Sequence, residues 1–158
     1  MIDHLIENID QRFLHQQTRL LCDSYLHWTG QHLIDGDPST PQAVRDLFEA
    51  DFALLSHGMQ SDPVFNYANR NALQLFGMSW HEITQLPSRY SAEPMLQNER
   101  ADFLTRVAQH GFVDDYSDVR IAKNGRKFMI INATVWNLID VDGNFCGQAA
   151  MLPEWHTI

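Results

Sequence analysis

Hydrophobic residues near the start of the chain recur at the spacing of an amphipathic helix. Between residues 2 and 13, apolar side chains occupy i, i+3, i+4 and i+7 positions. A second apolar stripe, rotated from the first, continues through residues 14–28, and no Gly or Pro interrupts the chain before Gly30. We therefore predict helix over residues 2–33, either as two helices or as one helix that changes its partner surface.

Short elements follow after a Gly- and Pro-containing break at residues 35–41. Thr40 and Pro41 predict the start of a short helix, because a threonine hydroxyl caps free backbone N–H groups and proline suits the first turn. Residues 53–57 and 64–67 are apolar runs separated by turn-forming residues, which is typical of two short strands.

Three helices are predicted in the middle of the chain. Asn69 and Gly77 predict the two ends of the first, and the word Ser-Trp-His-Glu at residues 79–82 is a capping box that begins the second. The third is longer and ends at Gly111. Its predicted inward-facing residues are Leu96, Phe103, Leu104 and Val107.

The last third of the chain is predicted to be antiparallel sheet. Residues 112–122 and 126–138 flank Asn124-Gly125, which indicates a hairpin because both residues tolerate a positive φ. A second turn at residues 140–144 precedes a final strand over residues 145–152. Strands that occur in runs, and do not alternate with long helices, predict the α+β class.

Charge and composition exclude several classes of function. The chain has 158 residues and a formal net charge of −9, which disfavours nucleic acid and anionic membrane surfaces. It has no apolar run long enough for a transmembrane helix, and its first residues do not resemble a signal peptide. Its two cysteines, Cys22 and Cys146, are far apart and fit reduced thiols in a cytoplasmic protein. Its histidines and cysteines form no metal-binding motif.

The order of the predicted elements resembles that of a PAS domain, and residues 62–73 are similar to the start of a PAS core. Longer words resemble the bacterial MEKHLA-domain proteins, a PAS-like family, at residues 24–25, 28–30, 75–80, 87–94, 135–140 and 147–150. This resemblance implies a PAS-like five-stranded antiparallel sheet with a helical cap, preceded by N-terminal helices. We expect a helical extension over residues 1–50 and a PAS-like MEKHLA core over residues 51–155.

The resemblance implies small-molecule sensing or protein association, and it implies no particular reaction or ligand. Plant members of the family end DNA-binding transcription factors, whereas this chain has no basic region and no output domain. Residues 87–94 contain no cysteine, so the covalent flavin photochemistry of light-sensing PAS domains is not expected, while noncovalent flavin stays open. Haem is not expected, because His110 ends its helix beside Gly111, where a cation is favoured without any ligand.

The facing of the strand over residues 112–122 depends on the hairpin. A strict two-residue turn would direct Val119 and Ile121 toward the helices. A bulge at Gly125 would instead direct the other set toward the helices, namely Tyr116, Asp118 and Arg120. By resemblance to PAS sheets, residues 128, 130, 132, 134 and 136 of the next strand should face the helices, as should residues 145, 147, 149 and 151 of the last.

Under the bulged register, four side chains would converge beneath the cap: Tyr116, Arg120, Asn132 and Trp136. A largely apolar cavity with a few polar groups is what a small-molecule site requires. Arg120 and Arg89 are candidates to bind a carboxylate or phosphate. The competing interpretation pairs Arg120 with Asp118, uses Arg89 to hold its own loop, and places Asn132 and Trp136 in the core.

The N-terminal apolar stripes supply the candidates for a dimer or relay helix, namely Phe13, Leu21, Tyr25 and Trp28. An apolar stripe outside the main core either meets a second subunit or folds back on its own domain, and both alternatives stay open. The outer face of the predicted sheet is also apolar, so the N-terminal helix is the obvious cover for it.

We expect a stand-alone, non-enzymatic PAS-like sensory module that binds a small molecule under its cap and signals through a homodimer or a partner protein. The alternative is a ligand-free protein-interaction or dimerisation domain with a filled core. A small enzyme using Asp118 and Tyr116 for proton transfer has no support beyond those two residues.

Overall fold

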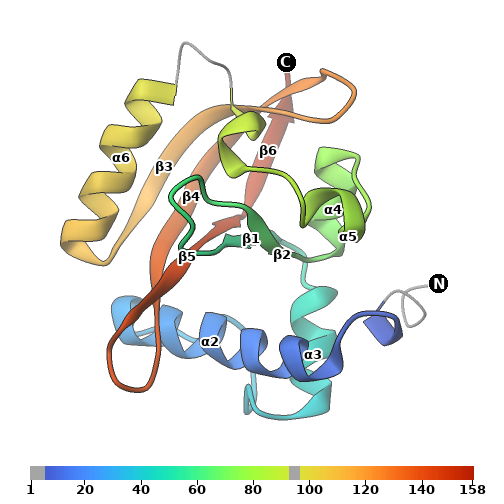
Figure 1. Cartoon of the computed structure of the whole chain (residues 1–158), viewed down its shortest axis with the longest axis vertical. Helices are drawn as coiled ribbons and strands as arrows, with labels where there is room; N and C mark the ends of the chain where they lie inside the picture. The colour runs from blue at the N-terminus through green and yellow to red at the C-terminus, as the bar shows by residue number, and fades with distance from the viewer. Residues whose placement is uncertain (1–5, 93–96) are drawn as a thin grey trace.

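The computed structural model describes residues 6–92 and 97–158, which fold around one antiparallel sheet (Figure 1). The strands pair in the order β2-β1-β5-β4-β3, and β6 pairs with β4. Their bounds are Ala53–His57 (β1), Phe65–Ala68 (β2), Phe112–Ile121 (β3), Lys127–Ile139 (β4), Phe145–Leu152 (β5) and Glu154–Thr157 (β6). This arrangement confirms the predicted α+β class and the predicted run of strands.

β6 was not predicted from the sequence. It pairs with residues 128–131 of β4, whereas β5 pairs with residues 134–139, so the two strands follow the same edge of β4 on either side of Pro153. A strand of four residues with charged or polar positions at Glu154 and His156 lacks the apolar alternation from which strands are predicted.

The helices lie on both faces of this sheet. Their bounds are Gln11–Thr29 (α2), Pro41–Phe48 (α3), Arg70–Phe76 (α4), Trp80–Ile83 (α5), Ser88–Ser91 (the 3₁₀ helix η1) and Gln97–His110 (α6). In Figure 1, α2 and α3 lie together at the bottom of the view, and α4, α5 and α6 lie above them around the sheet. We call α4, α5, η1 and α6 the helical cap.

The predicted helix over residues 2–33 is interrupted. Ile6 and Glu7 are helical, and α2 then begins at Gln11, because the Asp10 carboxylate accepts hydrogen bonds from the backbone N–H groups of Arg12 and Phe13. It ends at Thr29, since Gly30 adopts a φ of +73°. The prediction is therefore wrong at its C-terminal end, whereas the break at residues 8–10 fits its two-helix alternative. Its first four positions lie outside the described residues.

The local capping signals were predicted correctly. The Thr40 hydroxyl accepts a hydrogen bond from the N–H of Ala43 at the start of α3. Ser79 and Glu82 form the predicted capping box at α5. Phe103 and Val107 of α6 are buried as predicted, while Leu96 lies outside the described residues.

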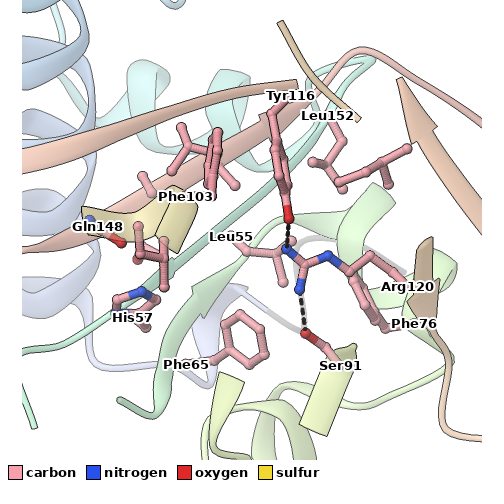
Figure 2. Close-up of a pocket in the computed structure, with 16 residues that line it drawn as sticks. Leu55, His57, Phe65, Phe76, Ser91, Phe103, Tyr116, Arg120, Gln148 and Leu152 are labelled. Atoms are coloured by element: carbon pink, nitrogen blue, oxygen red, sulfur yellow. Dashed lines mark hydrogen bonds between the residues drawn. The ribbon is translucent and has the colours of Figure 1, made fainter. Parts of the chain in front are cut away.

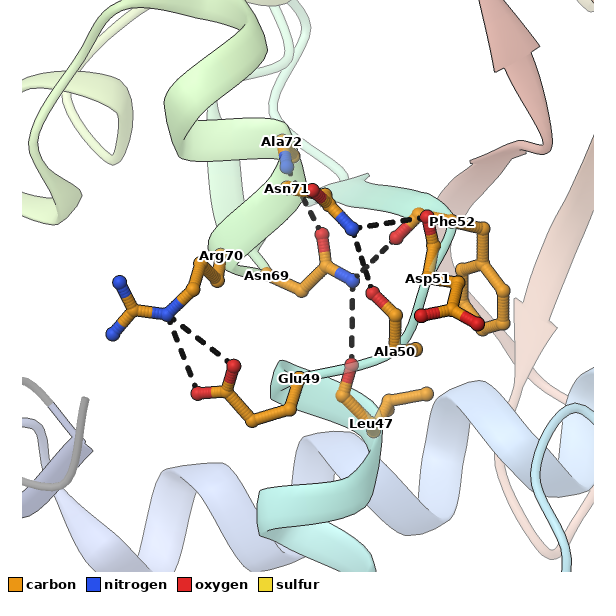
Figure 3. Close-up of polar contacts among 9 residues, drawn as sticks. All are labelled: Leu47, Glu49, Ala50, Asp51, Phe52, Asn69, Arg70, Asn71 and Ala72. Atoms are coloured by element: carbon orange, nitrogen blue, oxygen red, sulfur yellow. Dashed lines mark hydrogen bonds and ion pairs between the residues drawn. The ribbon is translucent and has the colours of Figure 1, made fainter.

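Asn69 links the two helical layers to the sheet (Figure 3). Its side-chain oxygen accepts from the N–H of Leu54 in β1 at 2.9 Å and of Ala72 in α4 at 3.1 Å. Its amide donates to the carbonyls of Phe52 and Leu47. One fully buried side chain thus joins the end of α3 to the start of both β1 and α4.

α2 and α3 share the main hydrophobic core with the sheet. Leu14 and Leu21 of α2 and Leu47 and Phe48 of α3 are almost completely buried in it. The division into residues 1–50 and 51–155 therefore remains an expectation about the chain, while in the structure both parts contribute to one core. Within the described ranges, no helix has the length and apolar character needed to cross a membrane.

Candidate functional site

The β3–β4 hairpin adopts the bulged register. The backbone N–H of Ala122 donates to the carbonyl of Arg126, and Gly125 has a φ of +84°, so the loop is one residue longer than a strict two-residue turn. Arg120 consequently lies opposite Phe128. Of the two facings that the sequence allowed, the structure therefore has the one that directs Tyr116 and Arg120 toward the helical cap.

A second irregularity inverts the far half of β4. Asn132 has a φ of +54°, and between Tyr116 and Asp118 the pairing advances two residues on β3 but three on β4. This extra residue is a β-bulge, and it shifts the alternation of side chains by one. Val135 therefore faces the cap, whereas Trp136 faces the opposite side of the sheet.

Two of the predicted ligand residues consequently lie outside the cavity. Asn132 is exposed at the bulge, and its N–H lies 3.4 Å from the Ser117 hydroxyl. Trp136 is completely buried and packs edge-to-face on Tyr25 of α2, with 4.9 Å between the ring centroids. The predicted facing of β5 is inverted in register as well, because Gln148 and Ala150 pair with Asn137 and Val135 and line the cavity, to which Ala149 also contributes.

A cavity lies between the sheet and the helical cap (Figure 2). Its volume is about 60 Å³. Most of its wall is apolar, formed by Leu55, Phe65, Phe76, Phe103, Leu104, Ile130, Val135, Ala149, Ala150 and Leu152. Its polar lining comes from Ser56, His57, Ser91, Tyr116, Arg120 and Gln148.

Arg120 supplies the guanidinium group of this cavity, and only 14% of its side chain is exposed. Figure 2 shows it pointing between Tyr116 and Ser91. One guanidinium nitrogen lies 3.2 Å from the Ser91 hydroxyl, and the other lies 3.4 Å from the Tyr116 hydroxyl. Its closest approach to the Asp118 carboxylate is 3.8 Å, which is too long for a hydrogen bond.

Asp118 is held by other groups. One carboxylate oxygen accepts a hydrogen bond from the Tyr116 hydroxyl, and the other accepts from the N–H of Val119 at 2.8 Å. The Tyr116 ring is stacked on Phe103 of α6, with 3.8 Å between the ring centroids. The predicted Arg120–Asp118 pair is therefore a loose contact within a cluster organised by Tyr116.

The other arginine candidate is not in the cavity. Arg89 donates from Nε to both oxygens of Asp62, at 3.0 and 3.2 Å, and its guanidinium lies over the Tyr90 ring. About 45% of its side chain is exposed. Asp62 lies in the loop between β1 and β2, so Arg89 joins its own segment to a different loop, whereas the competing interpretation had it hold its own loop.

A polar network that was not predicted from the sequence connects the cavity wall to α6 and α2. The Gln148 amide donates to the side-chain oxygen of Asn137, whose own amide donates to the carbonyl of Val107 in α6. The Asn137 carbonyl in turn accepts from the indole N–H of Trp28 at 2.9 Å. Uninterrupted alternation of side chains along β4 would place Asn137 on the outer face of the sheet. The network therefore depends on the bulge at Asn132.

α2 covers the outer face of the sheet. Leu21 and Tyr25 are buried there, and Phe13 and Trp28 are partly buried against the same core. In this structure the four candidate dimer or relay residues therefore make contacts within one chain, as the folded-back alternative requires. Among the described residues, no group of three or more His, Cys, Asp or Glu side chains is placed to hold a metal ion.

Comparisons with known proteins agree with this architecture. A PAS domain from Colwellia psychrerythraea superposes with a TM-score of 0.62 at 14% identity, over 74% of this chain and 94% of that one. The light-state dimer of the fungal blue-light photoreceptor Vivid gives a TM-score of 0.59 at 16% identity, over 84% and 90%. The dark structure of the Aureochrome1 LOV domain gives 0.53 at 20% identity, over 75% and 86%.

These similarities establish the fold, which is that of PAS and LOV sensory domains. The search of curated proteins finds no match. The sequence profile of the MEKHLA domain matches residues 15–157, which is most of the chain and includes α2 through β6. The protein therefore belongs to the MEKHLA-domain family, and its MEKHLA domain has a PAS-like fold.

Proposed function

We propose that this protein is a sensory module that binds a small molecule in the cavity beside Arg120 and transmits binding to α2. The observation that carries the proposal is a largely buried guanidinium group in the wall of an apolar cavity. Within residues 6–92 and 97–158, no carboxylate is hydrogen-bonded to it. A few directed polar groups in an apolar cavity are the usual composition of a ligand site. The proposal assigns no chemical reaction to the protein.

The network at Asn137 supports a route from the cavity to the outer face. Gln148 lines the cavity and donates to the side chain of Asn137, and the backbone carbonyl of the same residue accepts from Trp28. A ligand that displaces Gln148 would thus act on the residue that contacts α2. Coupling of this kind requires α2 to have two arrangements of similar free energy.

The interface beneath α2 is suited to such a change. Buried polar atoms without a hydrogen-bond partner among the described residues belong to Thr18 of α2, Tyr67 of β2 and Trp136 of β4. Each such group costs free energy when it is buried without a partner. The free energy that holds α2 on the sheet is therefore smaller than for a wholly apolar interface of the same area. Ligand binding consequently needs less free energy to release α2.

Release of α2 would expose the apolar outer face to a second copy of the chain or to a partner protein. The Vivid photoreceptor, which shares the fold, is a dimer in its light state. We expect Tyr25→Ala, which removes the contact with Trp136, to increase self-association in light scattering after size exclusion. Leu26→Ala is the matched control, since Leu26 is an exposed residue of the same helix. Equal masses for the two variants would contradict this part of the proposal.

The alternative is a ligand-free interaction domain, which the small size of the cavity favours. Cavities that hold drug-sized molecules measure about 300–1,000 Å³, whereas this one measures about 60 Å³. A flavin ring system does not fit it without rearrangement. Native mass spectrometry of the gently purified protein distinguishes the two functions, because the sensory module should carry a small bound mass and the interaction domain should carry none.

A further inference from the structure

The chemistry around Arg120 indicates a class of ligand. We propose that the cavity takes a short-chain carboxylate, with the carboxylate group on Arg120 and the apolar tail toward Ile130 and Val135. This inference rests on the proposed function of the cavity and deepens it by naming the ligand class. Three features favour this ligand class: the unused hydrogen-bond donors of Arg120, the position of Asp118 and the volume of the cavity.

Arg120 has more hydrogen-bonding capacity than its neighbours use. A guanidinium group carries five N–H donors in a planar fork that matches a carboxylate. Within residues 6–92 and 97–158, its hydrogen-bond acceptors are the hydroxyls of Ser91 and Tyr116, at 3.2 and 3.4 Å. Both contacts are long, and both acceptors are uncharged.

Asp118, the described acid beside Arg120, is not free to form a hydrogen-bonded pair with it. Both oxygens of Asp118 already accept hydrogen bonds, one from Tyr116 and one from the N–H of Val119, and the carboxylate remains 3.8 Å from Arg120. Its contact with Arg120 is therefore electrostatic without a hydrogen bond. A ligand carboxylate that replaces the Ser91 and Tyr116 hydroxyls as acceptors would form the stronger, charge-assisted bonds.

The volume limits the size of the ligand. A cavity of about 60 Å³, at about 10–15 Å³ for each water-sized occupant, has room for roughly four to six non-hydrogen atoms. Three of these belong to the carboxylate group, so the tail has roughly one to three carbon atoms. The apolar walls at Leu55, Phe76, Ile130 and Val135 match such a tail and do not provide acceptors for a polar one.

The test compares two probes that share an isopropyl tail, isobutyrate and isobutanol, added to the full chain at pH 7. The readout is the NMR shift of the Arg120 Nε–H and of the methyl groups of Ile130 and Val135. We expect saturable shifts with isobutyrate and at least about tenfold weaker binding of isobutanol, because the alcohol lacks the charge-assisted bonds. Arg120→Gln should weaken isobutyrate binding by at least about tenfold.

Arg89→Gln is the matched control, because Arg89 forms its ion pair outside the cavity, and it should leave isobutyrate binding unchanged. Arg120→Lys serves if Arg120→Gln does not fold, and it should give intermediate affinity because lysine keeps the charge without the fork.

The outcomes separate this inference from the proposed function. Equal binding of isobutanol and isobutyrate, insensitive to Arg120→Gln, would overturn the carboxylate class and leave the cavity as a ligand site. No shift with either probe, together with no bound mass in the purified protein, would overturn both. Isobutyrate-selective binding that depends on Arg120 supports both.

Discussion

At the scale of single residues, two backbone positions decide what the candidate site contains. Gly125 lengthens the β3–β4 turn and directs Arg120 into the cavity. Asn132, in the left-handed region, adds the bulge that directs Trp136 toward α2. The dipeptide Asn124-Gly125 predicts a turn from the sequence alone. Asn132 belongs to a residue type that tolerates a positive φ. A lone Asn within an apolar run is, however, too weak a signal to place a bulge.

The Asn132 bulge can be tested by substitution at that position. A β-branched residue at a φ of +54° is strained, so Asn132→Val should lower the free energy of unfolding by about 1–3 kcal/mol. Asn132→Gly is the matched control and should change it by less than about 1 kcal/mol, because glycine adopts this conformation freely. Urea unfolding measures both. Equal stability of the two variants would show that the bulge is absent.

Gly111, directly after the end of α6, packs closely against the Trp28 ring of α2. A Cβ atom added there would lie 2.3 Å from the Trp28 ring, at a φ of +90°. Gly111→Ala should therefore cost about 2–5 kcal/mol of stability, from left-handed strain and from overpacking. Gly143→Ala, at a φ of +84° with nothing within 4 Å, should cost only the strain of about 1–2 kcal/mol.

The contribution of the Trp28 contact follows from a double-mutant cycle. In a Trp28→Ala background the obstruction at Gly111 is gone, so Gly111→Ala should then cost about as much as Gly143→Ala. A cost that is the same in both backgrounds would mean that α2 does not pack against the end of α6 in solution.

At the scale of elements, the ends of helices could be predicted from nearby residues, whereas the contacts between distant elements could not. Thr40, Asn69 and Ser79 cap helices through atoms within three residues, so their roles could be predicted from sequence alone. The partner of α2 could not, because an apolar stripe specifies burial without specifying what covers it. Likewise, β6 pairs with the part of the β4 edge that β5 leaves unpaired. This edge exists only once the sheet has assembled, so the sequence pattern of β6 does not reveal it.

The docking of α2 can be followed through Cys22. Burial raises the pKa of the Cys22 thiol from 9.0 to about 12, and the nearby Asp23 adds to the rise. Because the thiolate is the reactive form, iodoacetamide should label Cys22 very slowly between pH 7 and 9. Release of α2 returns the thiol to water, so labelling should become faster and rise with pH across this range.

The measurement is mass spectrometry of the alkylated protein, with Cys146 as the internal reference since it is only partly buried. Tyr25→Ala should accelerate labelling of Cys22 relative to Cys146, whereas Leu26→Ala should not. Since the unfolded thiol ionises at the lower pKa, Cys22 also makes the folded state less stable as pH rises above about 9. Rapid labelling of Cys22 in the unaltered protein would contradict a docked α2.

At the scale of the whole molecule, the fold and the family could be predicted from the sequence, but the occupancy of the cavity could not. Motifs such as residues 75–80 and 87–94 resemble the MEKHLA family, and the matched range of residues 15–157 bears this out. The net charge of −9 makes a largely buried arginine conspicuous, and of the two candidates only Arg120 lies in the cavity. The position of the side chain in the fold, and not the residue type, distinguishes Arg120 from Arg89.

The central claim is that this cavity holds a small molecule, and native mass spectrometry of a cavity-filling variant tests it most directly. Ala150 lines the cavity from β5, so Ala150→Leu should occupy the space without disturbing Arg120. We predict a small noncovalent mass on the unaltered protein that is missing from the folded Ala150→Leu variant. Identical spectra, with no bound mass on either protein, would contradict a sensory role for the cavity.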